Sequence, residues 1–138
     1  MNHILLSNEY CFLKVHFSKK HYTDNRKGSP FHYIARLMKG TAKLRSYDST
    51  VSLEEGDVFY IPKGLPYEYF WYGEDIQWYS FGFHQFPEAA KTTYRLQKIL
   101  CDPSLKEELS SLPTPTEVNS QSLGAFYTVL AKILFIIS

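Results

Sequence analysis

Short β-forming stretches, separated by turn residues, fill the first two-thirds of this chain. They cover residues 10–17, 31–40, 41–53, 56–62, 67–73 and 76–86. Short strands at intervals of roughly 8–12 residues, divided by turn signals, are typical of antiparallel sandwiches and barrels. The sequence therefore predicts a mainly β fold for this part of the chain.

The turn residues predict how these strands are connected. Residues 47–49 (Tyr-Asp-Ser) divide one stretch into a hairpin, and residues 73–75 (Gly-Glu-Asp) separate two aromatic strands. Gly40 marks the end of a strand, and the polar segment 21–30, which contains Gly and Pro, predicts a loop.

The last third of the chain has a helical pattern. Segment 91–103 is ambiguous, and its weak alternation slightly favours a strand. Ser104 is a candidate N-cap for a short helix that ends near Pro113, and a linker follows at 113–117. Residues 119–138 give the strongest helix prediction, because apolar residues recur with the spacing of one helical face. Other apolar residues lie off that face, so both sides of this helix are expected to be covered.

Composition restricts the class of protein. A chain of 138 residues with net charge +1 and 21% charged residues suggests one globular domain, without the basic stripe of a nucleic-acid binder. The apolar C-terminal run contains Lys132 and is shorter than the ~20 residues that span a bilayer. The start shows no signal-peptide pattern, and Cys11 and Cys101 are read as free thiols in a reducing compartment. We therefore expect a cytoplasmic protein without a membrane partner.

A glycine-proline motif joins the apolar stretch to the aromatic one. Gly56, Pro62 and Gly64 have the spacing G-x5-P-x-G, in which glycines permit tight turns and the proline ends a strand. This motif resembles the second signature of the cupin superfamily, whose members are double-stranded β-helix barrels. In metal-binding cupins a histidine follows the motif, and Tyr67 occupies that position here.

The other metal ligands of such barrels are also missing from the sequence. The first cupin signature requires an HxH pair and a glutamate before a glycine; if Gly40 is that glycine, Tyr33 stands near the glutamate position. His32 is the nearest imidazole, and no second ligand stands at a suitable spacing. The sequence therefore predicts no metal, no cofactor and no catalytic residues.

Several segments together carry a closer resemblance. They are Arg26 before a glycine loop, the strand 31–40, LEEGDVFYIPKGLPYEY (53–69), IQWYSFGF (76–83) and GAFYTVLAKIL (124–134). Their order and spacing resemble the N-terminal effector-binding and dimerisation domain of AraC-type transcription regulators.

The resemblance implies an architecture. We expect a cupin-like jelly-roll barrel over residues 1–101, with an arm at 1–9, and two C-terminal α-helices in a dimerisation segment over 102–138. In the family a helix-turn-helix DNA-binding domain follows, so it is expected after residue 138. The function implied is ligand-responsive control of transcription, with a small-molecule effector, a second copy of the chain and, through that further domain, DNA as partners.

The same resemblance and the strand alternation predict the site residues. The expected ligand-binding residues are Tyr33, Lys39, Tyr67, Tyr69, Trp78, Ser80, Gly82 and His84. The expected dimerisation residues are Leu123, Tyr127, Leu130, Ile133, Leu134 and Ile137. Aromatic rings with a few polar groups suit a sugar, which is the candidate effector. Two other functions stay open at this point: an atypical cupin enzyme, such as an isomerase or lyase, and a stand-alone carbohydrate-binding module.

Overall fold

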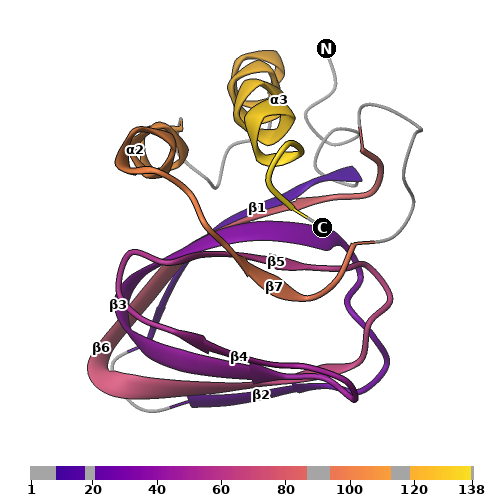
Figure 1. Ribbon diagram of the computed structural model, residues 1–138, viewed down its shortest axis with the longest axis vertical. Helices are drawn as coiled ribbons and strands as arrows, with labels where there is room; N and C mark the ends of the chain where they lie inside the picture. The colour runs from indigo at the N-terminus through magenta and orange to yellow at the C-terminus, as the bar shows by residue number, and fades with distance from the viewer. Residues whose placement is uncertain (1–8, 18–20, 87–93, 113–118, 138) are drawn as a thin grey trace.

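The computed structural model describes residues 9–17, 21–86, 94–112 and 119–137. Within them the elements are β1 (Cys11–Phe17), β2 (His21–Asn25), β3 (His32–Arg45), β4 (Thr50–Leu53), β5 (Val58–Ile61), β6 (Tyr67–Phe83), β7 (Gln97–Ile99), α2 (Pro103–Ser110) and α3 (Ser120–Ile133). The predicted mainly β fold with two C-terminal helices is confirmed (Figure 1). No helix in these ranges is long and apolar enough to cross a membrane. Most of the predicted arm and the linker 113–117 lie outside the described residues.

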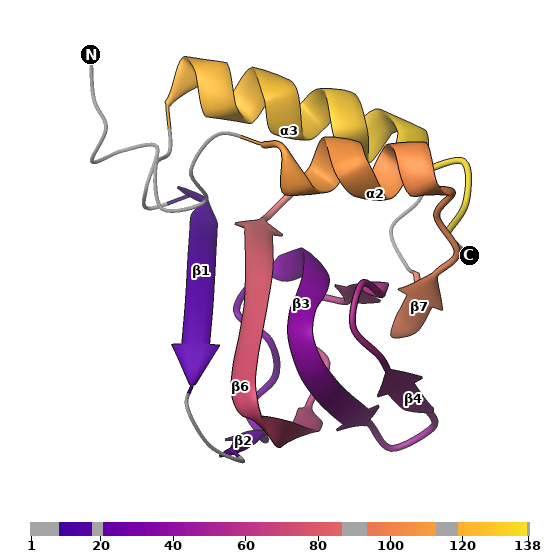
Figure 2. The same cartoon turned by 90° about the vertical axis from the view of Figure 1, so that its left-hand side faces the viewer.

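Two long strands, β3 and β6, hold the sheet together. In the half of the sheet below the helices, the strand order is β1-β6-β3-β5-β7. In the other half, β2 pairs with the first part of β6 and β4 pairs with the last part of β3. Figure 2 shows both long strands bending from one half into the other. The sheet is thereby folded over on itself, and the two helices lie against one of its outer faces.

The bend is formed by two glycines that lie side by side. Gly40 has φ 93° and Gly73 has φ 132°, a backbone region that favours glycine. A Cβ at Gly40 would lie 3.0 Å from the Tyr72 carbonyl oxygen, and one at Gly73 would lie 3.5 Å from the Gly40 Cα. The predicted strand end at Gly40 and the predicted hairpin turn at 73–75 are therefore wrong. Both positions are corners inside continuous strands.

The corners also change which alternate residues face inward. In β3 the inward residues are odd-numbered before the corner, such as Ala35, and even-numbered after it, such as Leu44. The β3–β6 pairing shifts register on both sides of Lys39, as at a β-bulge. Without that shift, the bend would leave one half of each strand with its apolar side toward solvent.

The other connections agree only partly with the sequence. The hairpin at 47–49 is confirmed, since the Ser46 amide donates to the Ser49 carbonyl over 2.8 Å between β3 and β4. The slight preference for a strand in 91–103 is confirmed for the three residues of β7, which pair with β5. The predicted loop 21–30 is wrong over residues 21–25, which form β2. This strand at the edge of the sheet was not recognised in the sequence, because the segment is polar.

Side-chain alternation in the strands produces two separate cores. The inner core lies between the two halves of the sheet and contains Ala35, Leu37, Ala42, Leu44, Leu53, Phe59, Ile61, Tyr67, Tyr69, Trp71, Ile76 and Leu96. The outer core lies between the sheet and the helices and contains Phe12, Ile34, Val58, Tyr60, Phe81, Phe83, Ile99, Leu105, Leu109, Phe126, Val129, Leu130, Ile133 and Ile137. A strand such as β3 therefore contributes to both cores through neighbouring residues.

Each helix begins at a polar cap. The cap of α2 is Asp102, whose carboxylate accepts from the Leu105 amide over 2.8 Å, with Pro103 at the first helical position. The predicted cap at Ser104 is therefore two residues too late. Helix α3 begins with a capping box, in which Asn119 and Ser122 each accept a backbone N–H from the other.

Polar contacts connect α2 both to the sheet and to α3, which lies beside it (Figure 1). The Arg36 guanidinium on β3 donates to the Gly56 carbonyl over 3.2 Å, to the Lys106 carbonyl over 3.0 Å and to the Ser110 hydroxyl. On the far side of α2, Lys132 of α3 forms an ion pair with Glu108 at 2.6 Å. Arg36 therefore connects the sheet directly to α2.

Candidate functional site

A cavity of about 140 Å³ lies in the inner core, between the two halves of the sheet. Its wall is formed by Leu13, Val15, Tyr33, Ala35, Ile61, Tyr67, Tyr69, Trp71, Trp78 and Ser80. These residues come from β1, β3, β5 and β6, so the cavity depends on the closure of the folded sheet. None of these described wall residues carries a formal charge.

The wall combines four of the predicted aromatic residues with one small one. Tyr67 and Tyr69 precede the corner of β6, and Trp78 and Ser80 follow it. Tyr33 enters from β3. Five of the eight residues predicted for the site thus line one cavity. On the opposite side of β6, Phe81 and Phe83 lie in the outer core, in agreement with the predicted alternation.

Stacked rings form one side of this cavity. The ring centroids of Trp71 and Trp78 lie 3.8 Å apart with an interplanar angle of 2°, and Tyr69 stacks on Trp71 at 4.5 Å. Phe17 lies against Trp78 at 5.6 Å. The Trp71 indole is therefore packed against two other rings, and its side chain is 0% exposed.

The polar groups of the wall are neutral. Burial raises the pKa of Tyr69 well above its usual value, and burial also raises the pKa of Tyr33, whose hydroxyl forms a hydrogen bond with the Cys11 thiol. Both phenols stay protonated near neutral pH and can donate a hydrogen bond. The Trp71 Nε1 is buried and has no acceptor among the described residues.

Three predicted site residues do not line the cavity. Gly82 lies beside it, but a Cβ at Gly82 would be 2.8 Å from Cε1 of Tyr33. The space that the small residue was expected to open for a ligand is filled by this tyrosine ring. Gly82 therefore supports the position of Tyr33.

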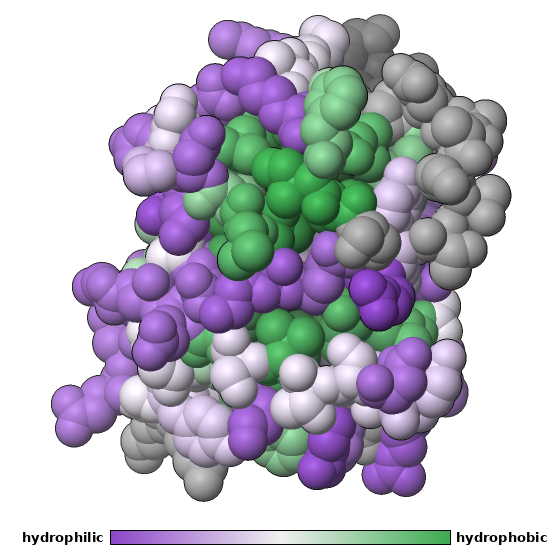
Figure 3. Space-filling model, viewed as in Figure 1, coloured by the Kyte–Doolittle hydropathy of each residue, from purple (hydrophilic) through white to green (hydrophobic). Residues whose placement is uncertain are grey.

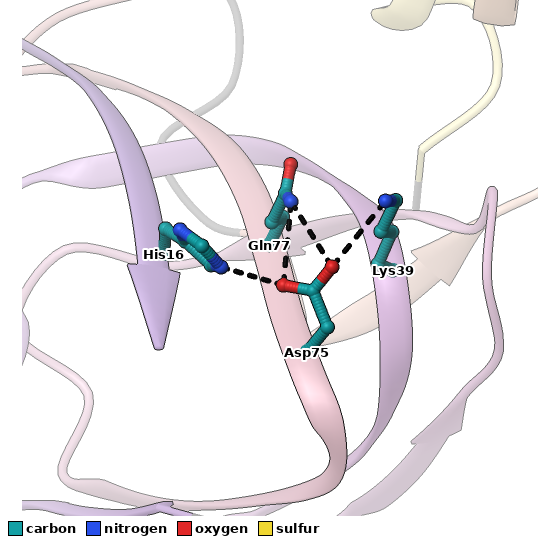
Figure 4. Close-up of polar contacts among 4 residues, drawn as sticks. All are labelled: His16, Lys39, Asp75 and Gln77. Carbon is teal, nitrogen blue, oxygen red and sulfur yellow. Dashed lines mark hydrogen bonds and ion pairs between the residues drawn. The ribbon is translucent and has the colours of Figure 1, made fainter. Parts of the chain in front are cut away.

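Lys39 lies at the outer corner of the sheet. Its ammonium is 3.3 Å from the Asp75 carboxylate, which also accepts from His16 over 2.5 Å and from Gln77 over 3.4 Å (Figure 4). Hydrogen bonds from Gln77 and His16 lower the pKa of Asp75. The predicted place of Lys39 at the rim of the cavity is wrong, because the bulge directs this residue to the outside.

His84 belongs to a different hollow. Its ring stacks on Phe31 with centroids 4.4 Å apart, and it lines a surface hollow of about 610 Å³ together with Glu9, Tyr10, Lys63, Gln85, Phe86 and Tyr127. In that hollow the Tyr10 and Tyr127 hydroxyls are 2.9 Å apart. Another hollow, of about 550 Å³, is lined by Arg26, Arg45, Ser46, Tyr47, Pro66, Tyr67 and Glu68. The second of these hollows shares Tyr67 with the cavity, and the first shares no wall residue with it.

Half of the residues in the cavity wall were not predicted from the sequence. The additional residues are Leu13, Val15, Ala35, Ile61 and Trp71. Trp71 could have been found, because it continues the alternation of Tyr67 and Tyr69. Leu13 and Val15 share the apolar side of β1, opposite Lys14 and His16. Ala35 and Ile61 required the strand pairing.

The structure also describes His32, the imidazole nearest to the positions that hold the ligands in metal-binding cupins. The His32 Nδ1 accepts from the Lys63 amide over 3.1 Å and lies 2.9 Å from the Tyr60 hydroxyl. Burial, together with the charges of Lys63 and His84, lowers the pKa of His32 to about 4. In the part of the chain that the structure describes, no three His, Cys, Asp or Glu side chains converge as metal ligands.

Comparison with known families decides the classification. A family model described as the AraC-like ligand binding domain matches residues 11–118. The chain belongs to this family. The AraC-like ligand binding domain therefore includes every described wall residue of the cavity. A search of curated protein sequences finds no match.

Solved structures support the fold of this AraC-like domain. ToxT from Vibrio cholerae is similar with a TM-score of 0.62 and 11% identity, over 90% of this chain and 54% of that chain. A second ToxT structure, from strain SCE256 with an unsaturated fatty acid bound, has a TM-score of 0.64 and 13% identity, over 93% and 53%. The chain thus spans about half of the length of ToxT.

A cupin superfamily protein from Desulfitobacterium hafniense DCB-2 is also similar, with a TM-score of 0.50 and 13% identity, over 57% of this chain and 71% of that one. These likenesses confirm the predicted cupin-like jelly-roll fold.

The predicted dimerisation residues need correction in this AraC-like domain. Leu130 and Ile133 are 0% exposed and Ile137 is 7% exposed, because all three pack in the outer core of the same chain. They are not available to a second copy. Leu123, Tyr127 and Leu134 are half-buried against the same core.

Proposed function

We propose that this chain is the effector-sensing domain of an AraC-type transcription regulator, and that it binds a small uncharged molecule in the inner cavity without catalysing a reaction. The observation that carries the proposal is the cavity itself, which lies between the two halves of the folded sheet and is lined by tyrosines, tryptophans and Ser80. Pockets of this kind combine apolar walls with a few polar groups that fix orientation.

The chemistry of the wall supports binding and offers little for catalysis. Its ionisable groups are phenols, and burial raises the pKa of Tyr33 and Tyr69, so neither suits a general base near neutral pH. Hydroxyls from Tyr33, Tyr69 and Ser80 can meet the polar groups of a guest. A protein that only binds its guest needs no groups beyond these hydroxyls and the apolar wall.

The sequence makes a monosaccharide the first candidate effector. Its hydroxyls match the neutral phenols and Ser80, although the covered faces of Trp71 offer no open platform for stacking. The ToxT structure with an unsaturated fatty acid suggests a second class of effector. The cavity of about 140 Å³ is well below the roughly 300–1,000 Å³ typical of drug-sized ligand pockets, and the wall lacks a cation for a carboxylate. We therefore favour the smaller, neutral guest.

Strand β3 offers a route from the cavity to the helices. Tyr33 and Ala35 face the cavity, whereas Ile34 packs in the outer core and Arg36 binds α2. A guest that favours one position of β3 changes the equilibrium of the α2 and α3 layer by its differential affinity. In the complete regulator, this would control a DNA-binding domain in the cytoplasm.

Self-association would then use side chains that remain exposed. Phe135 is 92% exposed, Leu100 is 79% exposed and Ile136 is 40% exposed. Figure 3 shows hydrophobic side chains gathered between the helices and the sheet, above a hydrophilic band. We propose that a second copy of the chain covers this region.

A thermal-shift screen of neutral mono- and disaccharides and small ring compounds tests the proposal. A true guest at 100 times its Kd adds about 2.7 kcal/mol of stability and raises the Tm. Ala35→Leu places a larger side chain into the cavity and should abolish the shift. Ala131→Leu, on the exposed side of α3, is the matched control and should retain it. Equal shifts in Ala35→Leu and wild type would place the binding elsewhere.

A further inference from the structure

Leu13 on β1 differs from the rest of the cavity wall in its exposure to solvent. It lines the cavity, yet it is 43% exposed. Six other wall residues are at most 7% exposed: Ala35, Ile61, Tyr67, Tyr69, Trp71 and Ser80. A side chain that borders both solvent and the inside of a cavity marks the place where the two meet. The mouth of the cavity therefore lies beside Leu13.

The position of β1 in the sheet agrees with this placement. Among the described strands, β1 pairs only with β6, so it forms an edge of the sheet. Figure 2 shows β1 at the margin of the sheet, with β6 on its inner side. A guest that enters past this edge does not need to separate two paired strands.

The strand register places Leu13 at one end of a row of three wall residues, which we call the slot. Leu13 is paired with Ser80 on β6, and Ser80 is paired with Ala35 on β3. All three line the cavity. Neighbouring strands lie about 4.8 Å apart, so the slot is about 10 Å long from Leu13 to Ala35. The short side chains of Ser80 and Ala35 leave room for a guest inward of Leu13.

Aromatic rings border the slot on both sides. On one side the Tyr33 ring fills the space beside Gly82, where a Cβ would lie 2.8 Å from Cε1 of Tyr33. The Tyr33 hydroxyl reaches the Cys11 thiol on β1. On the other side Trp78 is paired with Val15 of β1. Between these two rings, Leu13 is the side chain that stands between solvent and Ser80.

We infer that Leu13 controls entry into the cavity and is a specificity-determining residue. A guest passes Leu13, lies between the rings of Tyr33 and Trp78, and comes to rest on Ser80 and Ala35. The inference rests on the proposed function for the statement that an effector uses this entrance. A larger side chain at position 13 narrows the mouth, and a smaller one admits larger guests.

Thiol labelling of the 138-residue chain tests the position of the mouth without any effector. Ser80→Cys places a thiol in the slot, and N-ethylmaleimide, a neutral reagent with one small ring, reports whether it can be reached. Peptide mass spectrometry separates this reaction from those of Cys11 and Cys101. Added to Ser80→Cys, Leu13→Trp should slow the labelling by about tenfold or more, which corresponds to about 1.4 kcal/mol of additional barrier. Leu13→Ala should accelerate it.

Lys14→Trp is the matched control for Leu13→Trp. Lys14 is the next residue of β1, is exposed, and lies on the opposite side of the strand. The same large side chain at this position should leave the labelling rate of Ser80→Cys unchanged.

Two neutral alcohols test the selectivity through protection of the same thiol. Cyclohexanol has one ring, and an apolar cavity of about 150 Å³ holds a ring of this size, close to the volume of about 140 Å³ found here. 2-Decalol has two fused rings. With Leu13 in place, cyclohexanol should slow the labelling and 2-decalol should not. With Leu13→Ala, both should slow it.

The outcomes separate the inference from the proposed function. If Ser80→Cys does not react, or if Leu13→Trp and Lys14→Trp label equally fast, the mouth does not lie beside Leu13 and the inference is overturned. Labelling slowed only by Pro66→Trp would place the mouth at the outer hollow that shares Tyr67.

Urea unfolding of each variant gives an independent check. Labelling rates that follow stability instead of the size of residue 13 would mean that local unfolding exposes the thiol, which also overturns the inference. If labelling depends on Leu13 and neither alcohol protects, the mouth is supported, whereas the proposal that the cavity receives a guest of one ring fails.

Discussion

Single residues determine what the inner cavity can accept. Five aromatic residues face this cavity because side chains alternate between the two sides of a strand. They are Tyr33, Tyr67, Tyr69, Trp71 and Trp78. Four of them could be predicted from the sequence, because alternation is a local property. Lys39 and His84 could not, since their directions depend on a bulge and on the end of a strand.

His32 gives a prediction of pH dependence at this scale. Its pKa is about 4 in the folded chain and near 6.5 without the fold. Between these pH values the unfolded chain therefore binds more protons than the folded chain. The contribution of His32 to the free energy of unfolding is complete above about pH 6.5 and is lost as the pH falls toward 4. Gln does not titrate and can still accept from Lys63 and Tyr60, so His32→Gln should lose less stability over this range. Urea unfolding at several pH values measures the difference; parallel curves for both proteins would contradict it.

The bent strands are the elements on which the site depends. Each was predicted as two separate strands, because a glycine followed by polar residues is an ordinary turn signal. The physical reason for the difference lies in pairing: β6 stays hydrogen-bonded to β3 on both sides of the corner. No local pattern contains that information.

Gly40→Ala should disturb this corner. Alanine is strained at φ 93°, and its Cβ would lie 3.0 Å from the Tyr72 carbonyl oxygen. We expect a loss of about 2 kcal/mol or more in the free energy of unfolding. Gly124→Ala is the matched control: it lies in α3 with no atom within 4 Å of its Cβ, and it should gain about 0.5–1 kcal/mol. Chemical denaturation measures both, and an unaffected Gly40→Ala variant would show that the corner tolerates a side chain.

A second prediction at this scale concerns Arg36 and the connection between β3 and α2. Arg36→Met removes three hydrogen bonds that connect β3 to α2 and the Gly56 turn. The loss should be about 2–4 kcal/mol, with faster hydrogen exchange in α2. Lys132→Met removes only an exposed ion pair to Glu108 and should cost about 0–1 kcal/mol. Equal losses in both variants would mean that Arg36 does not anchor α2.

At the scale of the whole molecule, the helices cover one face of the sheet. The sequence predicted α3 well, but its apolar positions could not reveal which of them the chain itself buries. Leu130 and Ile133 are part of the chain's own core, whereas Phe135 is exposed. Apolar residues form both the core of a chain and the interface between two copies. Only the packing therefore shows which of the two an apolar residue belongs to.

Two substitutions test this division. Leu130→Asp buries an unpaired charge and should cost about 4 kcal/mol or more, so that the chain unfolds rather than dissociates. Phe135→Asp should change stability by less than about 0.5 kcal/mol, because the side chain is 92% exposed. If a second copy covers this region, Phe135→Asp lowers the mass measured by sedimentation. If the Leu130→Asp variant were instead folded and monomeric, the result would support the dimer interface that the sequence predicted.

The central claim is that the folded sheet encloses a guest and binds it through neutral side chains. A crystal structure of the chain with the compound that raises its Tm most in the screen tests this directly. The account predicts density for that compound inside the inner cavity, in contact with Tyr69 and Ser80. Density for the compound in one of the outer hollows, or an ion coordinated by side chains inside the barrel, would contradict it.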